Sequence, residues 1–500
     1  MSRRRDVDAV VVGSGPNGLA AALALAEAGR TVVVLEGAAT PGGGCRTTER
    51  TLPGHRHDVC ATVLPLLAAS PFATAIGLLA DGAVRLLTPE VSFAHVLDGS
   101  QVVAVARSLE VTLDGLGRDG PAYRRLLAPL LDHADALVGD VLASHRSWPS
   151  DPIALAAFAR LAVRPATGLA RRFDGERARA VLAGLAAHAT RPLDAPLTGG
   201  FALFLAVLAH HVGWPLAAGG TQAVTDALLA RLAALGVAVE TGSAVGTLDE
   251  LDAYGPPRLV LLDVTPRQLA ALAGSRLRPS QRRSLEGYRY GPGVHKVDWA
   301  LSEPVPWRSD TCRAAPTVHL GGDFAAVARA QADVAAGRHP ERPSCIVVQP
   351  TVVDPSRAPA GRHVLWATCA VPHGSTRDVT ALVEAELERA APGFRDVVVA
   401  RASTTAAASE AVNPNHVGGD INGGAATLAH TLVGPQVRLD PYRTPLPGVF
   451  LCSSSVPPGG GVHGMCGWLA AQSALGAEAA RASKNGRSAR RGTSARNSLP

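Results

Sequence analysis

The segment VDAVVVGSGPNGLAAALALAEAGRTVVVLE, residues 7–36, constrains the fold more than any other part of the chain. A short apolar run before Gly13 predicts a buried strand, and the Ala/Leu-rich stretch after it predicts a helix that ends at Gly29. TVVVLE predicts a second strand, which ends at Glu36. This order of strand, glycine turn, helix and strand is typical of a βαβ unit, so we expect an α/β fold with a Rossmann-type parallel sheet.

The glycines of this segment predict a dinucleotide site. Gly13, Gly15 and Gly18 have the spacing G-x-G-x-x-G, which allows a tight turn and the close approach of a pyrophosphate to a helix N-terminus. Glu36 can accept hydrogen bonds from the ribose hydroxyls, and its charge would repel a 2′-phosphate. The residues therefore favour NAD or FAD over NADP.

The choice of FAD rests on a resemblance. PGGGCRTTERTLPGHRHDV, residues 41–59, resembles the second flavin motif of the glutathione-reductase-like FAD superfamily. In that superfamily the chain passes under the flavin pyrophosphate, which implies contacts from Gly43, Gly44 and Arg46. Cys60 is a departure, because related desaturases usually carry a glycine after this loop.

The C-terminal block PLPGVFLCSSSVPPGGGVHGMCGWLAAQSAL, residues 445–475, resembles the last flavin-binding motif of phytoene-desaturase-like and amine-oxidase-like flavoproteins. The resemblance implies that the helix N-terminus faces the isoalloxazine ring and that His463 lies beside it as a candidate catalytic residue. A covalent link through His463 or Cys466 is conceivable, but noncovalent FAD is favoured. The flavin contacts implied here are Gly460, Gly461, Val462 and Met465.

The resemblance divides the chain into non-contiguous domains. Residues 219–248 predict a helix and two short strands and resemble the family's return to the FAD domain, with Val245 near the adenine. We expect residues 1–75, 216–275 and 396–480 to form the FAD domain. Residues 76–215 and 276–395 should form an inserted α+β substrate domain with a helical cap.

Lys296 lies in GPGVHKVDWALSEPVPW, residues 291–307. Only two of the 48 Lys and Arg residues are lysines, and the other one is Lys484. The segment resembles the one whose lysine holds a water near flavin N5 in amine oxidases. A compact ammonium suits that role better than a planar guanidinium. The alternative is a lysine at the rim of a strand with an exposed head group.

Charge and composition exclude several functions. The net charge of +6 equals that of the basic segment 481–500, which we expect to be disordered, so nucleic-acid binding is not favoured. Seven cysteines without CxxC spacing predict neither a disulfide framework nor a metal site. Five histidines without carboxylates at ligand spacing are interpreted as packed or hydrogen-bonded: His55, His57, His188, His210 and His211.

The chain enters its first strand directly after MSRRR and contains no apolar run of about 18 residues, which predicts a cytoplasmic protein without a membrane span. The Ala/Leu/Arg helices of residues 151–173 and 175–189 are interpreted as a protein-facing cap or a homodimer contact. Peripheral docking on a membrane surface is the alternative.

The resemblance implies an FAD-dependent oxidoreductase that acts on a C–C or C–N bond of a largely apolar small molecule, such as a carotenoid or another isoprenoid. No second GxGxxG follows a strand, so oxygen or a quinone is the expected electron acceptor. Two alternatives stay open. One is an amine oxidase, and the other is a binding or regulatory protein on the same fold, as the Rab GDP-dissociation inhibitors resemble this superfamily without using flavin.

Overall fold

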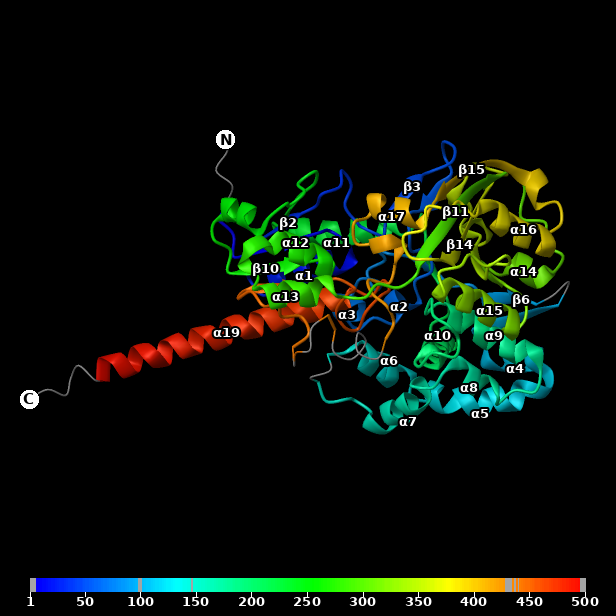
Figure 1. Cartoon of the computed structure of the whole chain (residues 1–500), viewed down its shortest axis with the longest axis horizontal. Helices are drawn as coiled ribbons and strands as arrows, with labels where there is room; N and C mark the ends of the chain where they lie inside the picture. The colour runs from blue at the N-terminus through cyan, green and yellow to red at the C-terminus, as the bar shows by residue number, and fades with distance from the viewer. Residues whose placement is uncertain are drawn as a thin grey trace, which may run out of the picture.

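Two β-sheets organise the chain, and helices pack around both of them (Figure 1). The computed structural model describes residues 6–97, 101–144, 147–427, 434–435, 438 and 440–494. One sheet has five strands and the other has seven. The α/β fold class expected from the sequence is confirmed.

The five-stranded sheet is parallel, with the strand order β16-β10-β1-β2-β9. Its central strands are almost uninterrupted runs of Val and Leu, as expected for strands that are buried on both faces. The helix after β1 packs against α11 and α19. These strands and helices are β1 (Ala9–Val12), β2 (Val32–Leu35), β9 (Ala238–Glu240), β10 (Leu259–Leu262), β16 (Val449–Leu451), α1 (Pro16–Glu27), α11 (Gln222–Ala234), α12 (Pro266–Ala273), α13 (Pro279–Glu286) and α19 (Met465–Ser494).

The seven-stranded sheet is mixed, with the order β15-β11-β14-β13-β12-β6-β7. All its neighbours are antiparallel except the parallel pair of β6 and β12. Both predicted insertions therefore contribute to a single sheet. Its strands are β6 (Val91–Val96), β7 (Val102–Ala106), β11 (Gly293–Leu301), β12 (Thr317–Leu320), β13 (Cys345–Val348), β14 (His363–Val371) and β15 (Val398–Thr404).

The structure corrects two details of the expected organisation. We expected the third FAD segment to begin at residue 396, but β15 pairs with β11 in the seven-stranded sheet, because its long antiparallel register satisfies the edge of β11. Residues 219–248 contain one strand, β9, rather than two, since the glycines of TGSAVGT end the extended run.

Helices between β7 and β8 (Leu216–Ala217) form the cap below the seven-stranded sheet in Figure 1. They are α4 (Leu109–Leu116), α5 (Gly120–Leu131), α6 (Ala134–Leu142), α7 (Pro152–Ala162), α8 (Ala166–Ala170), α9 (Glu176–Ala187) and α10 (Thr198–His211). The remaining elements are β3 (Thr47–Glu49), β4 (Arg56–Asp58), β5 (Leu86–Leu87), α2 (Pro65–Ala68), α3 (Pro71–Ala75), α14 (Asp310–Ala314), α15 (Phe324–Ala335), α16 (Thr380–Ala390) and α17 (Ala406–Val412).

The cap carries a small exposed apolar surface. Trp148 is 94% exposed and Ile153, at the start of α7, is 82% exposed. No helix in the described ranges is both long and apolar enough to cross a membrane. The expected dimer or peripheral membrane contact of residues 151–173 and 175–189 stays a prediction.

The basic tail is helical where we expected disorder. Helix α19 continues to Ser494 and extends away from the body of the molecule (Figure 1). Ala, Arg and Lys have high helix propensity, and no proline interrupts the segment before residue 495. The prediction of a disordered tail from residue 481 is therefore wrong up to Ser494, and residues 495–500 lie outside the described part.

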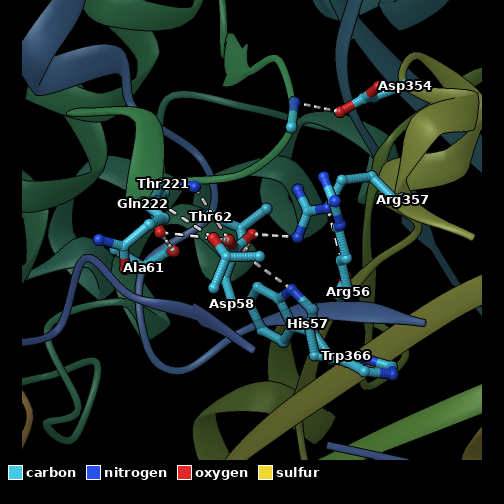
Figure 2. Close-up of polar contacts among 12 residues, drawn as sticks. Arg56, His57, Asp58, Ala61, Thr62, Thr221, Gln222, Asp354, Arg357 and Trp366 are labelled. Atoms are coloured by element: carbon cyan, nitrogen blue, oxygen red, sulfur yellow. Dashed lines mark hydrogen bonds and ion pairs between the residues drawn. The ribbon is translucent and has the colours of Figure 1, made fainter. Parts of the chain in front are cut away.

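A fully buried carboxylate, Asp58, lies between the two sheets (Figure 2). Its Oδ1 accepts hydrogen bonds from Thr47 Oγ1 at 2.7 Å and from the backbone N of Thr221 at 3.0 Å. Its Oδ2 accepts from Thr62 Oγ1 and from Arg357 Nη2, each at 2.8 Å. Asp58 thus joins the start of β3, the start of α11 and the segment that leads into β14.

The guanidinium of Arg357 offsets the energetic cost of burying the charged Asp58 carboxylate. Burial alone would raise the pKa of Asp58, but Arg357 and the hydroxyl and amide donors more than reverse this and lower it. Arg357 also donates from Nε to the Arg56 carbonyl, and Trp366 Nε1 donates to Thr62 Oγ1 at 2.9 Å. We call these contacts of Asp58, Thr62, Arg357 and Trp366 the inter-sheet joint.

We expect Arg357→Met to lower the free energy of unfolding by about 3–5 kcal/mol, because it leaves the Asp58 charge buried without a cation. Urea unfolding followed by tryptophan fluorescence measures the loss. Arg124→Met is the matched control, since the Arg124–Glu110 pair is exposed and should contribute little. Equal unfolding free energies for the two variants would contradict the joint.

Candidate active site

A cavity of about 660 Å³ opens at the carboxyl ends of the parallel strands β1, β2, β9 and β10. This is the edge at which parallel α/β sheets bind their ligands. Three sequence segments that are far apart in the chain meet in its walls. The predicted cofactor residues that line it are Gly13, Gly15, Glu36, Gly43, Gly44, Arg46, Val245, Gly461 and Val462.

The glycine turn lies where the sequence places it, but its members differ in role. Gly13 has φ +98°, a conformation that favours glycine. A Cβ on Gly18 would lie 2.1 Å from the Gly13 carbonyl oxygen, so Gly18 permits α1 to pack closely on the turn and does not itself line the cavity. A Cβ on Gly43 would lie 3.0 Å from the Cα of Gly15, so the two glycine segments also approach each other closely.

Glu36, the first residue after β2, holds the glycine turn in place from the cavity wall. Its Oε2 accepts from the backbone N of Ser14 at 2.9 Å and from Ser14 Oγ, and its Oε1 accepts from the N of Ala38 at 2.8 Å. The side chain is half-buried and lines the cavity. Both oxygens of this carboxylate are therefore held by backbone amides at the cavity wall.

Sequence reasoning missed Asp263, which follows β10 as Glu36 follows β2. Its side chain is 7% exposed, lines the cavity and accepts from the Gly18 backbone N at 3.1 Å. Burial raises the pKa of this carboxyl to about 7, and the nearby Glu36 adds to the rise, although hydrogen bonds from Gly18 and Gly15 oppose it. The position of Asp263, an acidic residue directly after the apolar run of β10, was the signal that could have identified it.

A second cavity of about 280 Å³ adjoins the first, and we call it the chamber. Both are lined by Cys60, His188, Trp214 and Gly461, so they share a wall. The chamber extends toward the seven-stranded sheet. Its walls there are largely apolar, and they include Val294, Ile346, Val348 and Trp366.

Lys296 lines the chamber from the middle of β11, and its side chain is buried. Its Nζ donates to Asp298 Oδ1 and lies 5.3 Å from the ring centre of Trp366. Arg50 Nε lies 3.0 Å from the other oxygen of Asp298. Burial lowers the pKa of Lys296, and Asp298 opposes that shift. The interpretation of Lys296 as an exposed lysine at a strand rim is therefore wrong.

Only part of the last flavin motif lines the cavities. Gly461 and Val462 line the cavity, whereas Gly460, His463 and Met465 are absent from the described lining of both cavities. Met465 begins α19 and is 1% exposed. A Cβ on Gly460 would lie 3.0 Å from the Asn422 carbonyl oxygen, so this glycine serves the packing of two loops.

His463 is a structural residue, which corrects its expected catalytic role. It is 1% exposed; Nε2 lies 3.1 Å from the Gly459 carbonyl oxygen, and Nδ1 accepts from the Met465 backbone N at 3.0 Å. Burial lowers the pKa of the imidazole to about 4, so the ring is neutral at pH 7 with its proton on Nε2. With both nitrogens used within its own turn, His463 has none to offer a ligand.

His188 and His416 both line the two cavities. The Nε2 of His188 lies 3.1 Å from His319 Nε2, and farther from the cavities His95 Nε2 lies 2.8 Å from the Gly322 carbonyl oxygen. Burial lowers the pKa of His188 and of His95 to about 4, so both rings are neutral. His188 is thus hydrogen-bonded, as the sequence predicts, but it also forms part of the cavity wall.

The comparisons with known proteins agree with this geometry. A family model described as an NAD(P)-binding Rossmann-like domain matches residues 11–74. The mouse protein named pyridine nucleotide-disulfide oxidoreductase domain-containing protein 2 is 25% identical, with 93% of each chain covered. One of the subunits of limonene dehydrogenase from Castellaniella defragrans is 33% identical over 24% of this chain and 22% of its own.

Solved structures with similar folds are also oxidoreductases. An oxidoreductase from Methanosarcina mazei has a TM-score of 0.62 at 17% identity and covers 93% of this chain and 99% of its own. Putrescine oxidase bound to putrescine has a TM-score of 0.58 at 19% identity, with 95% and 99% covered. Cyclohexylamine oxidase from Brevibacterium oxydans has a TM-score of 0.56 at 16% identity, with 95% and 100% covered. The chain therefore contains a Rossmann-like domain and shares its overall fold with these solved oxidases.

Proposed function

We propose that the protein is an FAD-dependent oxidoreductase that binds FAD noncovalently in the 660 Å³ cavity and its substrate in the chamber. One observation carries the proposal. Residues of all three flavin-like motifs line one cavity, and the single lysine expected near a flavin lines the chamber that adjoins it.

The residues present fit FAD. Glu36 would hold the ribose hydroxyls, and the Gly13–Gly18 turn at the N-terminus of α1 would hold the pyrophosphate. Val245 would contact the adenine, and Gly461 and Val462 would contact the flavin ring. A Cβ on Gly461 would lie 2.3 Å from Leu66 Cδ1, so this glycine lets the loop pack closely against Leu66 at the cavity wall.

A noncovalent flavin agrees with the surroundings of the two nucleophiles near this motif. Cys466 is fully buried, and its single S–H has the carbonyls of Val456 and Gly459 as acceptors within reach. Burial raises the pKa of this thiol to about 12, so it is not a nucleophilic thiolate at pH 7. His463 uses both ring nitrogens within its turn.

A bound flavin would supply the redox chemistry by accepting a hydride equivalent from a C–H bond of the substrate. The chain itself binds, orients and excludes water. Lys296 presents an ammonium at the chamber wall, which would position a water and stabilise negative charge on a reduced flavin. Asp298 fixes the direction of this ammonium, and Trp366 shields one side of it.

The charge of the chamber helps to decide the substrate class. Lys296 and Arg50 share the single carboxylate of Asp298, so one positive charge is left without a partner in this cluster. His57, 3.5 Å from Asp298, is neutral because burial lowers its pKa to about 4. A protonated amine would be repelled here, so we favour dehydrogenation of a largely apolar, uncharged small molecule, such as an isoprenoid, with oxygen or a quinone as electron acceptor.

Amine oxidation is the second candidate, and it is favoured by the fold shared with putrescine oxidase and cyclohexylamine oxidase. It would require the amine to enter the chamber in its neutral form. A flavin-free binding protein on the same fold would need neither the buried Lys296 nor the room for a dinucleotide at Glu36, and a protein without flavin would support it.

We expect Glu36→Ala to weaken FAD binding on the order of a hundredfold, because charge-assisted bonds to the ribose and the support of Ser14 are both lost. Acid precipitation of the purified protein, followed by absorbance of the supernatant, measures the bound FAD. Wild type should release its FAD and the variant should contain little. Glu240→Ala is the matched control, because Glu240 ends the neighbouring β9 and bonds Tyr254 instead.

Three results would contradict this account. Unchanged FAD content in Glu36→Ala would show that the ribose is held elsewhere. Yellow colour that stays with the wild-type pellet would show a covalent flavin. Wild-type protein that contains no FAD and cannot be reconstituted with it would end the enzyme proposal.

We expect Lys296→Met to slow oxidation of the photoreduced protein by oxygen on the order of a hundredfold while FAD stays bound. Asp298 keeps Arg50 as its cation, so the variant should fold. Lys296→Arg should restore little of the rate, because a planar guanidinium cannot take the place of a compact ammonium. Stopped-flow absorbance measures the rate without a known substrate. Lys484→Met is the matched control, and equal rates in all four proteins would remove Lys296 from the site.

A further inference from the structure

Asp263 introduces a conflict of charges into the cavity that the proposed function assigns to FAD. Its carboxyl lies against the Gly13–Gly18 turn: Oδ2 accepts from the Gly18 backbone N at 3.1 Å and would lie 2.6 Å from a Cβ on Gly15. The turn is also where the pyrophosphate of a dinucleotide binds. An ionised Asp263 and a pyrophosphate would therefore place two anions at one helix N-terminus.

In the described part of the chain, no cationic side chain offsets the charge of Asp263. The groups that face it are the backbone amides of Gly15 and Gly18 from α1, the carboxylate of Glu36 from β2, and two neutral thiols, Cys452 after β16 and Cys466 in α19. Asn415 donates to its backbone carbonyl and leaves its charge unchanged. Among the described residues no Lys or Arg contributes to its electrostatics.

Two other buried carboxylates, Asp58 and Asp298, differ in this respect. Asp58 is paired with Arg357, and Asp298 is shared by Lys296 and Arg50. Asp263 alone of these three depends on backbone amides, which are the same donors that a pyrophosphate would use. Protonation is the simplest way for it to stay buried beside a second anion.

We propose that Asp263 couples FAD binding to the uptake of one proton, because its carboxyl takes a proton from solvent when the pyrophosphate occupies the Gly13–Gly18 turn. The inference rests on the proposed function, since it assumes that the dinucleotide is FAD or another pyrophosphate. It makes Asp263 a positioning residue of the cofactor site, whose protonation state decides how tightly the cofactor is held.

The direction of the pH dependence follows from the raised pKa of Asp263, about 7 in the free protein. Below about pH 7 the carboxyl is already neutral, so the affinity for FAD should not change with pH. Above it the free protein loses the proton that the bound state keeps. The dissociation constant should then rise by up to about tenfold per pH unit.

The test measures FAD binding to the apoprotein of the full chain between about pH 6 and about pH 9 by quenching of flavin fluorescence. Calorimetry at about pH 8 in two buffers that differ in ionisation enthalpy counts the protons taken up. The variant is Asp263→Asn, which keeps an acceptor oxygen for the Gly18 amide. The matched control is Asp119→Asn, since Asp119 is a buried carboxylate that accepts from the Gly175 and Asp174 amides at the start of α9, outside the cavity.

Wild type and Asp119→Asn should take up close to one proton per FAD at about pH 8, and their affinity for FAD should fall above about pH 7. Asp263→Asn should take up no proton and should bind FAD equally at about pH 6 and about pH 9. Equal pH profiles for wild type and Asp263→Asn would overturn the inference. Absence of proton uptake by wild type would also overturn it, and that measurement needs no variant to fold. FAD binding without the coupling would leave the proposed function standing, whereas no FAD binding at any pH would remove both.

Discussion

The buried carboxylate of Asp58 is the contact on which the arrangement of the two sheets depends. It accepts hydrogen bonds from Thr47 at the start of β3 and from the start of α11, and it forms an ion pair with Arg357 beside the seven-stranded sheet. The chamber draws its walls from both sides of this joint. A shift of one sheet against the other would therefore change the place of Lys296 relative to the dinucleotide cavity.

Three buried carboxylates show how the chain distributes charge around its cavities. Asp58 has one cation, so the joint is neutral, and Asp298 has two, so the chamber is positive. Asp263 has none and lies in the dinucleotide cavity, where burial raises its pKa to about 7. The chamber thus carries a net positive charge beside Asp298, while the Gly13–Gly18 turn has a carboxyl that can become neutral.

The sequence predicts the elements whose signals are local. GSGPNG and Glu36 identify the βαβ unit and its ligand edge because strand, turn, helix and acid are consecutive. It could not reveal Asp263 or the partners of Asp58, because Asp58 and Arg357 are brought together only by the fold. His463 shows the opposite limit: its motif places it near the ring, but its two nitrogens turn to Gly459 and Met465. The continuation of α19 to Ser494 was not predicted, because the Ser, Asn, Gly and Arg content of the tail indicates disorder, whereas its Ala, Arg and Lys residues have high helix propensity.

The central claim is that segments distant in sequence form one FAD site, and hydrogen exchange of backbone amides with and without FAD tests it most directly. FAD should slow exchange in residues 13–18, 36–46, 243–246 and 461–464 together, since all four segments contribute to the cavity wall. Peptides of the cap helices α5 and α7, which do not line it, should be unchanged. Protection limited to the glycine turn, or absent from 461–464, would contradict a site that extends from the adenine pocket to the flavin motif.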